Sequence, residues 1–178
     1  MRADEPFARS RDYDLQHSKI VLKFDVDQKK VIGDVTHTLS ILKDTNKIWF
    51  DSVGLAIQSV LLNKSSAKFE TKEDKLIIPL AAAAKTGDKF EVEIKYEGKT
   101  SKGAYFILPD KDYPDRPKQI WTQGESEDTR YYLPTYDYPN DRLTTETILT
   151  VPAAWITVAN GKLVSVKPST VNSAKRRA

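Results

Sequence analysis

The amino-acid sequence predicts an all-β domain, an antiparallel β-sandwich with an irregular insertion rich in aromatic and acidic residues. Residues 20–26 and 90–96 alternate between apolar and polar or charged side chains, as half-buried strands do. Shorter apolar runs follow one another at the spacing expected for a sandwich. No stretch keeps an apolar period of 3.6 residues for more than about two turns, which argues against helical bundles and βαβ sheets.

The first two strands are expected to form a hairpin. Apolar residues occupy every second position of residues 20–26, and the turn-like residues 27–30 separate them from a second alternating run over residues 31–41. Because each strand can bury only one face, the alternation predicts the following core residues. They are Ile20, Leu22, Phe24, Val35, Leu39, Phe90, Val92 and Ile94.

Further strands are expected along the rest of the chain. They lie over residues 47–51, 56–62, 68–71, 75–80, 145–151, 155–160 and 163–166. The four alanines of residues 81–84 favour a helix by composition, but Pro79 and Gly87 bound this short run. We therefore expect a loop there.

The 178 residues are expected to form a single domain. A polar lead occupies residues 1–18, the β domain residues 19–168, and a basic tail, expected to be frayed, residues 169–178. The tail carries three of the 28 Lys and Arg residues and no acid, so it accounts for the whole net charge of +3. A folded basic face is therefore not expected, and we predict no nucleic-acid partner.

Composition excludes other classes as well. No apolar run approaches the roughly 20 residues of a membrane-spanning helix, and the N-terminus lacks the apolar core of a signal peptide. We expect no transmembrane segment in this chain. The absence of cysteine excludes disulfides, thiol nucleophiles and Cys-ligated metals. Localisation stays open between the cytoplasm and export by a signal peptide outside this sequence.

Two histidines, His17 and His37, are the candidates for metal or triad chemistry. Catalytic zinc typically needs an arrangement such as H-E-x-x-H, and neither histidine belongs to one or follows a G-x-S-x-G nucleophile elbow. We expect His37, which lies between Val35 and Leu39, to be a hydrogen-bonded core histidine. Glu125 with Asp137 is a candidate carboxylate pair of the glycosidase type, although acid-rich loops are common.

Residues 105–142 differ in character from the rest of the chain. They contain six of the eight tyrosines, eight acidic residues and five basic ones, and prolines interrupt regular pairing. This net negative charge would attract a cation. Because strands are expected on both sides, we interpret the segment as an insertion between sandwich strands, where functional loops commonly lie.

The most specific motif lies inside this insertion. Residues 120–125 read Ile-Trp-Thr-Gln-Gly-Glu, and residues 130–139 read Arg-Tyr-Tyr-Leu-Pro-Thr-Tyr-Asp-Tyr-Pro. The stretch resembles the T-Q-x-[EQ]…A-R…F-P-C-x-D-x-P segment in the N-terminal domain of the aminopeptidase N family of zinc metallopeptidases, peptidase family M1. Thr135 stands where the family often has Cys, and Tyr138 where it usually has Glu.

Flanking residues agree with the same family in order and spacing. They are Tyr13-Asp-Leu, Gly33-Asp-Val-Thr, Gly103-Ala-Tyr and Val158-Ala-Asn-Gly. The resemblance extends over residues 13–166. It implies a saddle-like, mostly antiparallel β domain that precedes a thermolysin-like catalytic domain and supplies one wall of its active site.

The resemblance also implies roles for four residues. Glu125 would anchor the free α-amine of a peptide substrate, and Gln123 would line the pocket for its first side chain. Gly124 would permit close backbone approach, and Arg130 would support the loop by pairing with a motif carboxylate. An ammonium group removed from bulk water needs a counter-charge and acceptors, which a fixed carboxylate supplies.

The zinc implied by the resemblance belongs to the catalytic domain, which is absent from this chain. Neither G-x-M-E-N nor H-E-x-x-H occurs here, so we expect this chain to bind no cofactor and not to be catalytic alone. Its implied partners are the catalytic domain of the same polypeptide and peptide substrates. Two alternatives remain: a non-catalytic protein-interaction scaffold of the same architecture, and a carbohydrate-binding sandwich that uses Trp121 and tyrosine faces.

Overall fold

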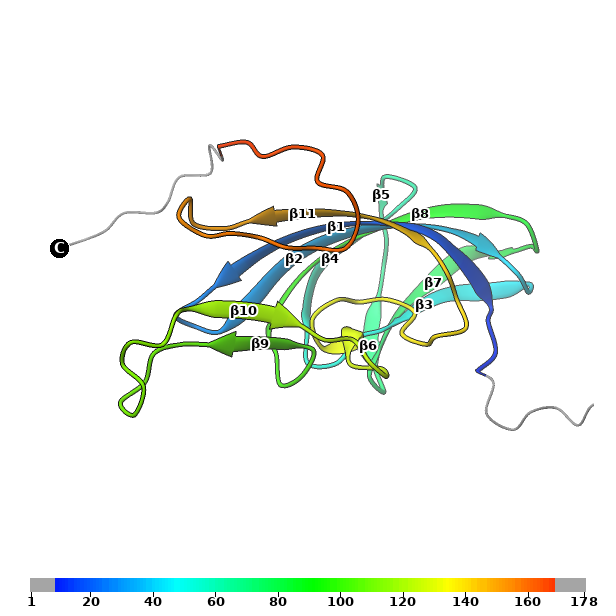
Figure 1. Ribbon diagram of the computed structural model, residues 1–178. Helices are drawn as coiled ribbons and strands as arrows, with labels where there is room; N and C mark the ends of the chain where they lie inside the picture. The colour runs from blue at the N-terminus through cyan, green and yellow to red at the C-terminus, as the bar shows by residue number, and fades with distance from the viewer. Residues whose placement is uncertain (1–8, 169–178) are drawn as a thin grey trace, which may run out of the picture.

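The computed structural model describes residues 9–168, and strands dominate it (Figure 1). The strands are β1 (Tyr13–Asp25), β2 (Lys30–Ile41), β3 (Thr45–Asp51), β4 (Ala56–Leu62), β5 (Ser65–Ser66), β6 (Glu70–Lys72), β7 (Lys75–Ala84), β8 (Lys89–Lys99), β9 (Ala104–Ile107), β10 (Gln119–Thr122) and β11 (Thr144–Thr150). A short 3₁₀ turn, η1 (Thr129–Tyr131), follows β10. The predicted all-β fold is confirmed.

Three sheets make up the domain. The largest has six strands in the order β11-β1-β2-β8-β4-β5, the second has the order β3-β7-β6, and β9 pairs with β10 in a separate ribbon. In Figure 1 the six-stranded sheet is curved and arches over the β3–β7 pair. Neighbouring strands are antiparallel except β1 and β11, which are parallel. A long insertion precedes β11, so no tight hairpin dictates its direction.

The core lies between the two larger sheets. β2 buries every second residue, as its alternating sequence predicts, and its neighbour β8 adds apolar side chains from the same sheet. β3 and β7 face them from the second sheet. The fully buried apolar residues of these four strands are Val31, Val35, Leu39, Ile41, Ile48, Phe50, Leu76, Ile78, Val92, Ile94 and Tyr96. Gly33 lies directly under the Tyr96 ring, where a Cβ would lie 2.1 Å from Cζ of the tyrosine.

Five of the eight predicted core residues are buried, namely Leu22, Val35, Leu39, Val92 and Ile94. Ile20, Phe24 and Phe90 are only partly buried and pack against the margin of the core. A three-stranded sheet cannot cover the whole face of a six-stranded one, so parts of β1, which lies between β11 and β2, and the start of β8 stay partly open.

Strand β1 begins inside the stretch that the sequence assigned to a polar lead. Tyr13, Leu15 and Ser18 of this strand are buried. A β-bulge between Leu15 and His17 shifts the register, so buried residues fall at uneven spacing and conceal the alternation. Residues 1–8 of the lead and the basic tail lie outside the described residues.

Two other expectations about strands are wrong. The four alanines of residues 81–84 end strand β7 instead of forming a loop, because Ala84 pairs with Thr45 of β3. Residues 155–160 and 163–166 form no strand. Their apolar side chains are exposed, with Ile156 at 93% and Val158 at 91%, and within residues 9–168 no neighbouring strand pairs with them.

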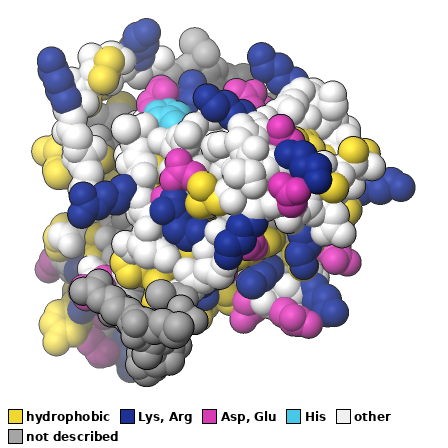
Figure 2. All heavy atoms as spheres, turned by 90° about the vertical axis from the view of Figure 1, so that its right-hand side faces the viewer, with side chains coloured by type: hydrophobic (Ala, Val, Ile, Leu, Met, Phe, Trp, Pro, Cys, Tyr) yellow, Lys and Arg dark blue, Asp and Glu magenta, His cyan; other side chains and the backbone are white. Residues whose placement is uncertain are grey.

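The surface carries charges of both signs. On the face that Figure 2 shows, lysine and arginine side chains are interspersed with aspartate and glutamate. The structure also contains cross-strand ion pairs, among them Lys30 with Glu97 and Lys95 with Asp34. Within the part of the chain that the structure describes, no helix has the length and apolarity needed to cross a membrane.

His37 is a fully buried, hydrogen-bonded histidine, as predicted. Its Nδ1 lies 2.7 Å from the Ser18 hydroxyl and its Nε2 lies 2.8 Å from the carbonyl oxygen of Pro134. A carbonyl can only accept, so Nε2 carries the proton and Ser18 donates to Nδ1. Burial lowers the pKa of His37 to about 4, although the hydrogen bond to Pro134 acts in the opposite direction. The ring therefore stays neutral at physiological pH.

Truncation of a core leucine should destabilise the domain far more than truncation of a surface one. Leu39 is fully buried and Leu42, three residues later, is 42% exposed. We expect Leu39→Ala to lower the free energy of unfolding by about 2–5 kcal/mol and Leu42→Ala to change it by no more than about 0.5 kcal/mol. Urea unfolding of the two variants measures this. Equal losses would contradict the assigned core.

Stability should fall between pH 7 and pH 5 through His37. The unfolded chain takes up a proton near pH 6.5, whereas the folded chain resists protonation down to about pH 4. We expect this group to remove about 2 kcal/mol of the free energy of unfolding over that interval. Urea unfolding at both pH values should show a smaller pH dependence for His37→Gln than for the natural sequence. The same dependence in both proteins would exclude His37 as its source.

Candidate functional site

Residues 123–137, called the motif segment here, continue from the β9–β10 ribbon. The Gln123 amide donates to the carbonyl of Gly103 at 2.8 Å, which extends the ribbon by one residue. A turn over residues 124–128 follows, closed by the Asp128 amide donating to the Gly124 carbonyl at 3.0 Å. The segment then enters η1 and passes beneath β1 and β2 in Figure 1.

Two glycines allow this turn to pack closely. Gly103 has a φ of +75°, and a Cβ there would lie 2.1 Å from the carbonyl oxygen of Asp128. A Cβ on Gly124 would lie 2.4 Å from the Thr129 hydroxyl. Both positions therefore exclude larger residues. The peptide bond between Glu125 and Ser126 is cis.

Arg130 joins the two ends of the motif segment. Its Nε donates to Asp137 Oδ2 at 3.0 Å, and its backbone amide donates to the same oxygen at 3.0 Å. A terminal nitrogen also contacts the Asp137 carbonyl at 2.9 Å and forms an ion pair with Glu127. Asp137 is buried, so a substrate in solvent has no access to it. This placement does not favour the alternative in which Glu125 and Asp137 act as a catalytic carboxylate pair.

Backbone hydrogen bonds attach the motif segment to β3. Asp51 and Thr135 exchange two of them, at 2.7 and 3.1 Å, in an isolated antiparallel bridge. The Val53 amide donates to the Arg130 carbonyl at 3.0 Å, and His37 holds Pro134 from the other sheet. The segment is thus fixed to both larger sheets despite its irregular backbone.

Among the acids of the turn over residues 124–128, Glu125 is the one whose carboxylate has no partner within residues 9–168. Glu127 pairs with Arg130, and Asp128 lies 3.7 Å from Lys102, so neither of these carboxylates is free. The Glu125 side chain is exposed and has no hydrogen-bond or ion-pair partner within residues 9–168. Gln123 is exposed as well. A fixed loop therefore carries one free carboxylate that a cationic ligand can approach.

Sequence reasoning missed the residues that hold the loop from the β3 side. Asp51 ends β3 and is 2% exposed, and Arg9 donates to both of its carboxylate oxygens. The sequence does hold one sign of this buried carboxylate, because Asp51 directly follows the apolar run Ile48-Trp-Phe. Its cationic partner lies 42 residues earlier, where no local pattern connects the two.

The site is open instead of enclosed. Two surface hollows of about 280 and 470 Å³ lie elsewhere, lined mainly by residues of β4 to β7 and their connections, with no contribution from the motif segment. Within residues 9–168, no group of three or more His, Cys, Asp or Glu side chains is placed to hold a metal ion. The motif segment can thus contribute a wall and a carboxylate, while a metal centre would have to come from elsewhere.

Comparison with known proteins agrees with the motif. Probable aminopeptidase 1 of Sulfurisphaera tokodaii is 28% identical over 133 residues, which cover 72% of this chain and 16% of that protein. Probable aminopeptidase 1 of Saccharolobus solfataricus is 33% identical over 96 residues, or 54% of this chain and 11% of that protein. The chain thus spans a small part of the relatives it matches.

Solved structures show the same fold. The crystal structure of an M1 zinc metallopeptidase from Deinococcus radiodurans superposes with a TM-score of 0.77 at 22% identity, over 90% of this chain and 37% of that one. Yeast LTA4 hydrolase has a TM-score of 0.65 at 21% identity, over 79% of this chain and 24% of that one. The family model described as peptidase M1 N-terminal domain matches residues 10–176. This chain therefore belongs to the peptidase M1 N-terminal domain family, as the motif over residues 120–139 predicted.

Proposed function

We propose that this chain is the N-terminal domain of a zinc-dependent aminopeptidase and that it supplies the anchor for the free α-amine of peptide substrates. The observation that carries the proposal is the state of Glu125. Its carboxylate is exposed and unpaired on a turn whose other two acids are engaged by Arg130 and Lys102. Aminopeptidases among the relatives support the reaction class.

The chemistry of the anchor follows from charge and geometry. A substrate ammonium donates up to three hydrogen bonds, and a carboxylate accepts them while neutralising its charge. Because the backbone of the motif segment is tied to β3 and to His37, binding has to order the Glu125 side chain but not the segment that carries it, which reduces the entropic cost. Gln123, exposed at the end of the ribbon, lines the pocket for the first side chain in this proposal.

Zinc belongs to the catalytic domain of the same polypeptide in this proposal, where it would activate the water that attacks the first peptide bond. This chain contributes the wall that orients the amine end of the substrate. Its described residues include no cluster suited to the metal. The alternative of a protein-interaction scaffold predicts the same fold but no role for Glu125.

One observation favours the second alternative, a carbohydrate-binding sandwich. Trp121 is 47% exposed and stacks on Tyr105 with ring centroids 4.4 Å apart and an interplanar angle of 20°. Aromatic faces of this kind bind sugar rings in many proteins. Saturable binding of oligosaccharides, with no binding of peptides that have a free amine, would favour this function over the first.

Replacement of Glu125 should impair catalysis in the complete polypeptide that carries this domain. Glu125→Ala leaves a desolvated ammonium unpaired, a loss of about 2–5 kcal/mol, which corresponds to roughly 30- to several-thousand-fold in kcat/KM. Glu125→Gln should be milder, because the amide keeps one acceptor oxygen for the amine although it loses the charge. Aminopeptidase kinetics on aminoacyl arylamides measures both effects.

Asp115 provides the matched control for this experiment. It is an exposed acid between β9 and β10 and, within residues 9–168, it has no ion-pair partner. Asp115→Ala should change kcat/KM by less than about threefold. Affinity for an inhibitor without a free amine should be equal in all variants. Near-normal kcat/KM for Glu125→Ala would contradict amine anchoring by this residue.

The chain alone should bind no stoichiometric zinc and release no amino acid from aminoacyl arylamides. Its two histidines occupy different surroundings and do not form a pair of metal ligands. His37 is buried with both ring nitrogens engaged, and His17 lies near Thr144. Metal analysis of the purified chain tests this. One tightly held zinc per chain, lost on replacement of either histidine, would overturn the assignment of the metal to another domain.

A further inference from the structure

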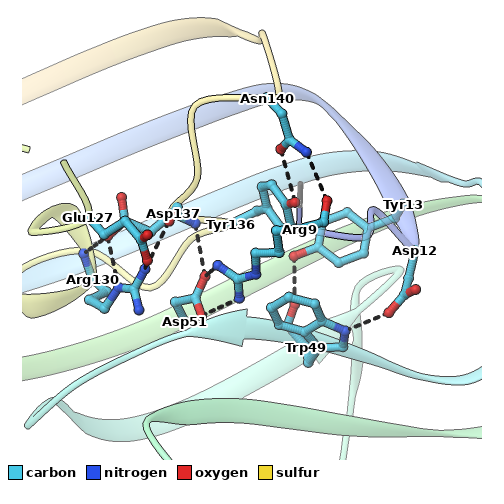
Figure 3. A network of polar contacts seen from close by, with 10 residues as sticks. All are labelled: Arg9, Asp12, Tyr13, Trp49, Asp51, Glu127, Arg130, Tyr136, Asp137 and Asn140. Carbon is cyan, nitrogen blue, oxygen red and sulfur yellow. Dashed lines mark hydrogen bonds and ion pairs between the residues drawn. The ribbon is translucent and has the colours of Figure 1, made fainter. Parts of the chain in front are cut away.

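We propose that Arg9, outside the motif, is a positioning residue that sets the orientation of the Glu125 turn, an inference that rests on the proposed function. Arg9 precedes β1 and reaches the end of β3 (Figure 3). Its Nη1 donates to Asp51 Oδ2 at 2.8 Å and its Nη2 to Asp51 Oδ1 at 2.6 Å. Such two-pronged pairing fixes both the distance and the plane of the carboxylate.

The Arg9 guanidinium is itself held by aromatic rings. Its Cζ lies 4.7 Å from the centroid of a Trp49 ring and 4.9 Å from that of Tyr136. The Asn140 side chain donates to the Arg9 carbonyl at 2.9 Å and accepts a hydrogen bond from the Tyr136 hydroxyl at 3.0 Å. A planar cation in contact with two neighbouring rings suits arginine better than lysine.

Asp51 connects Arg9 to the motif segment. Its side chain is 3% exposed, and Oδ2, which accepts from Arg9, also accepts from the Asp137 amide at 3.0 Å. Asp137 in turn binds Arg130, which pairs with Glu127 two residues after Glu125. Ion pairs and hydrogen bonds therefore form a continuous chain from Arg9 to Glu127 in the turn that carries the free carboxylate, as Figure 3 shows.

Loss of Arg9 would leave a buried carboxylate without its cation. A buried unpaired charge is strongly unfavourable, so Asp51 would take up a proton or turn toward water. Either change weakens the hydrogen bond between the Asp51 carboxylate and the Asp137 amide. Asp137 is then held less firmly, and its pairing with Arg130 weakens as well. The Glu125 turn would then sample more orientations, which affects binding of the amine more than the later chemical step.

Two variants in the complete polypeptide test this inference. For Arg9→Met, we expect the Asp137 amide to exchange its hydrogen about 10- to 100-fold faster, which is the effect expected for a lost hydrogen bond to a charged group. We expect KM for aminoacyl arylamides to rise about tenfold while kcat stays within about threefold. Arg9→Lys should recover part of both effects, because it restores the charge without the planar fork.

Lys30→Met is the matched control. Lys30 pairs with Glu97 between β2 and β8, and its side chain is 23% exposed, close to the 21% of Arg9, although Glu97 is less buried than Asp51. Within residues 9–168, no hydrogen bond or ion pair joins this pair to the motif segment. This variant should leave both the exchange of the Asp137 amide and KM unchanged. A rise in exchange or KM equal to that of Arg9→Met would show a general loss of stability and overturn the inference.

The remaining outcomes separate this inference from the proposed function. If Glu125→Ala impairs kcat/KM but Arg9→Met changes neither exchange nor KM, the positioning role is wrong and the amine anchor stands. If Arg9→Met accelerates exchange with no change in KM, the positioning role is wrong as well, because the network would then be merely structural. If Glu125→Ala is neutral, the proposed function fails and the inference fails with it.

Discussion

The buried carboxylate of Asp51 is the group on which the candidate site depends. It accepts two hydrogen bonds from Arg9 and one from the Asp137 amide, while its backbone bridges Thr135. Removing a charge from water is unfavourable unless partners surround it, so loss of one of these contacts weakens the others. Residues before β1, the end of β3 and the irregular segment after η1 are therefore joined at one point.

The same network explains how an irregular loop can hold a precise orientation. The motif segment has little regular secondary structure, yet its backbone groups are bound by β3, by His37 and by side chains within the segment. Three of its acids have a cationic partner, since Arg130 pairs with two of them and Lys102, outside the segment, with the third. The negative charge of Glu125 is left over at the surface of a rigid support, which is the arrangement that recognition of a cation requires.

Much of the fold follows from the sequence because strands β2 and β8 obey a strict alternation that admits one buried face. The motif residues Gln123, Gly124, Glu125 and Arg130 were found by resemblance, since nothing in their local pattern distinguishes an anchor from an ordinary acidic turn. The start of β1 was missed because a β-bulge breaks its period. Arg9 and Asp51 were missed because their pairing spans 42 residues, a distance over which periodicity carries no information.

Near the end of the described chain, strands were predicted that the structure does not form. Strands were expected over residues 155–160 and 163–166, but such a sequence becomes a strand only where a neighbour supplies hydrogen bonds and covers one face. No such neighbour exists for them within residues 9–168, and the side chains stay exposed. Local pattern thus reports the capacity to pair, whereas tertiary context decides whether pairing occurs.

A crystal structure of the complete polypeptide with a bound free amino acid would test the account most directly. The account predicts that the ammonium lies within hydrogen-bond distance of the Glu125 carboxylate, and that Asp51 still bridges Arg9 and the Asp137 amide in that complex. An ammonium bound by other residues, with the Glu125 side chain directed into solvent, would contradict it.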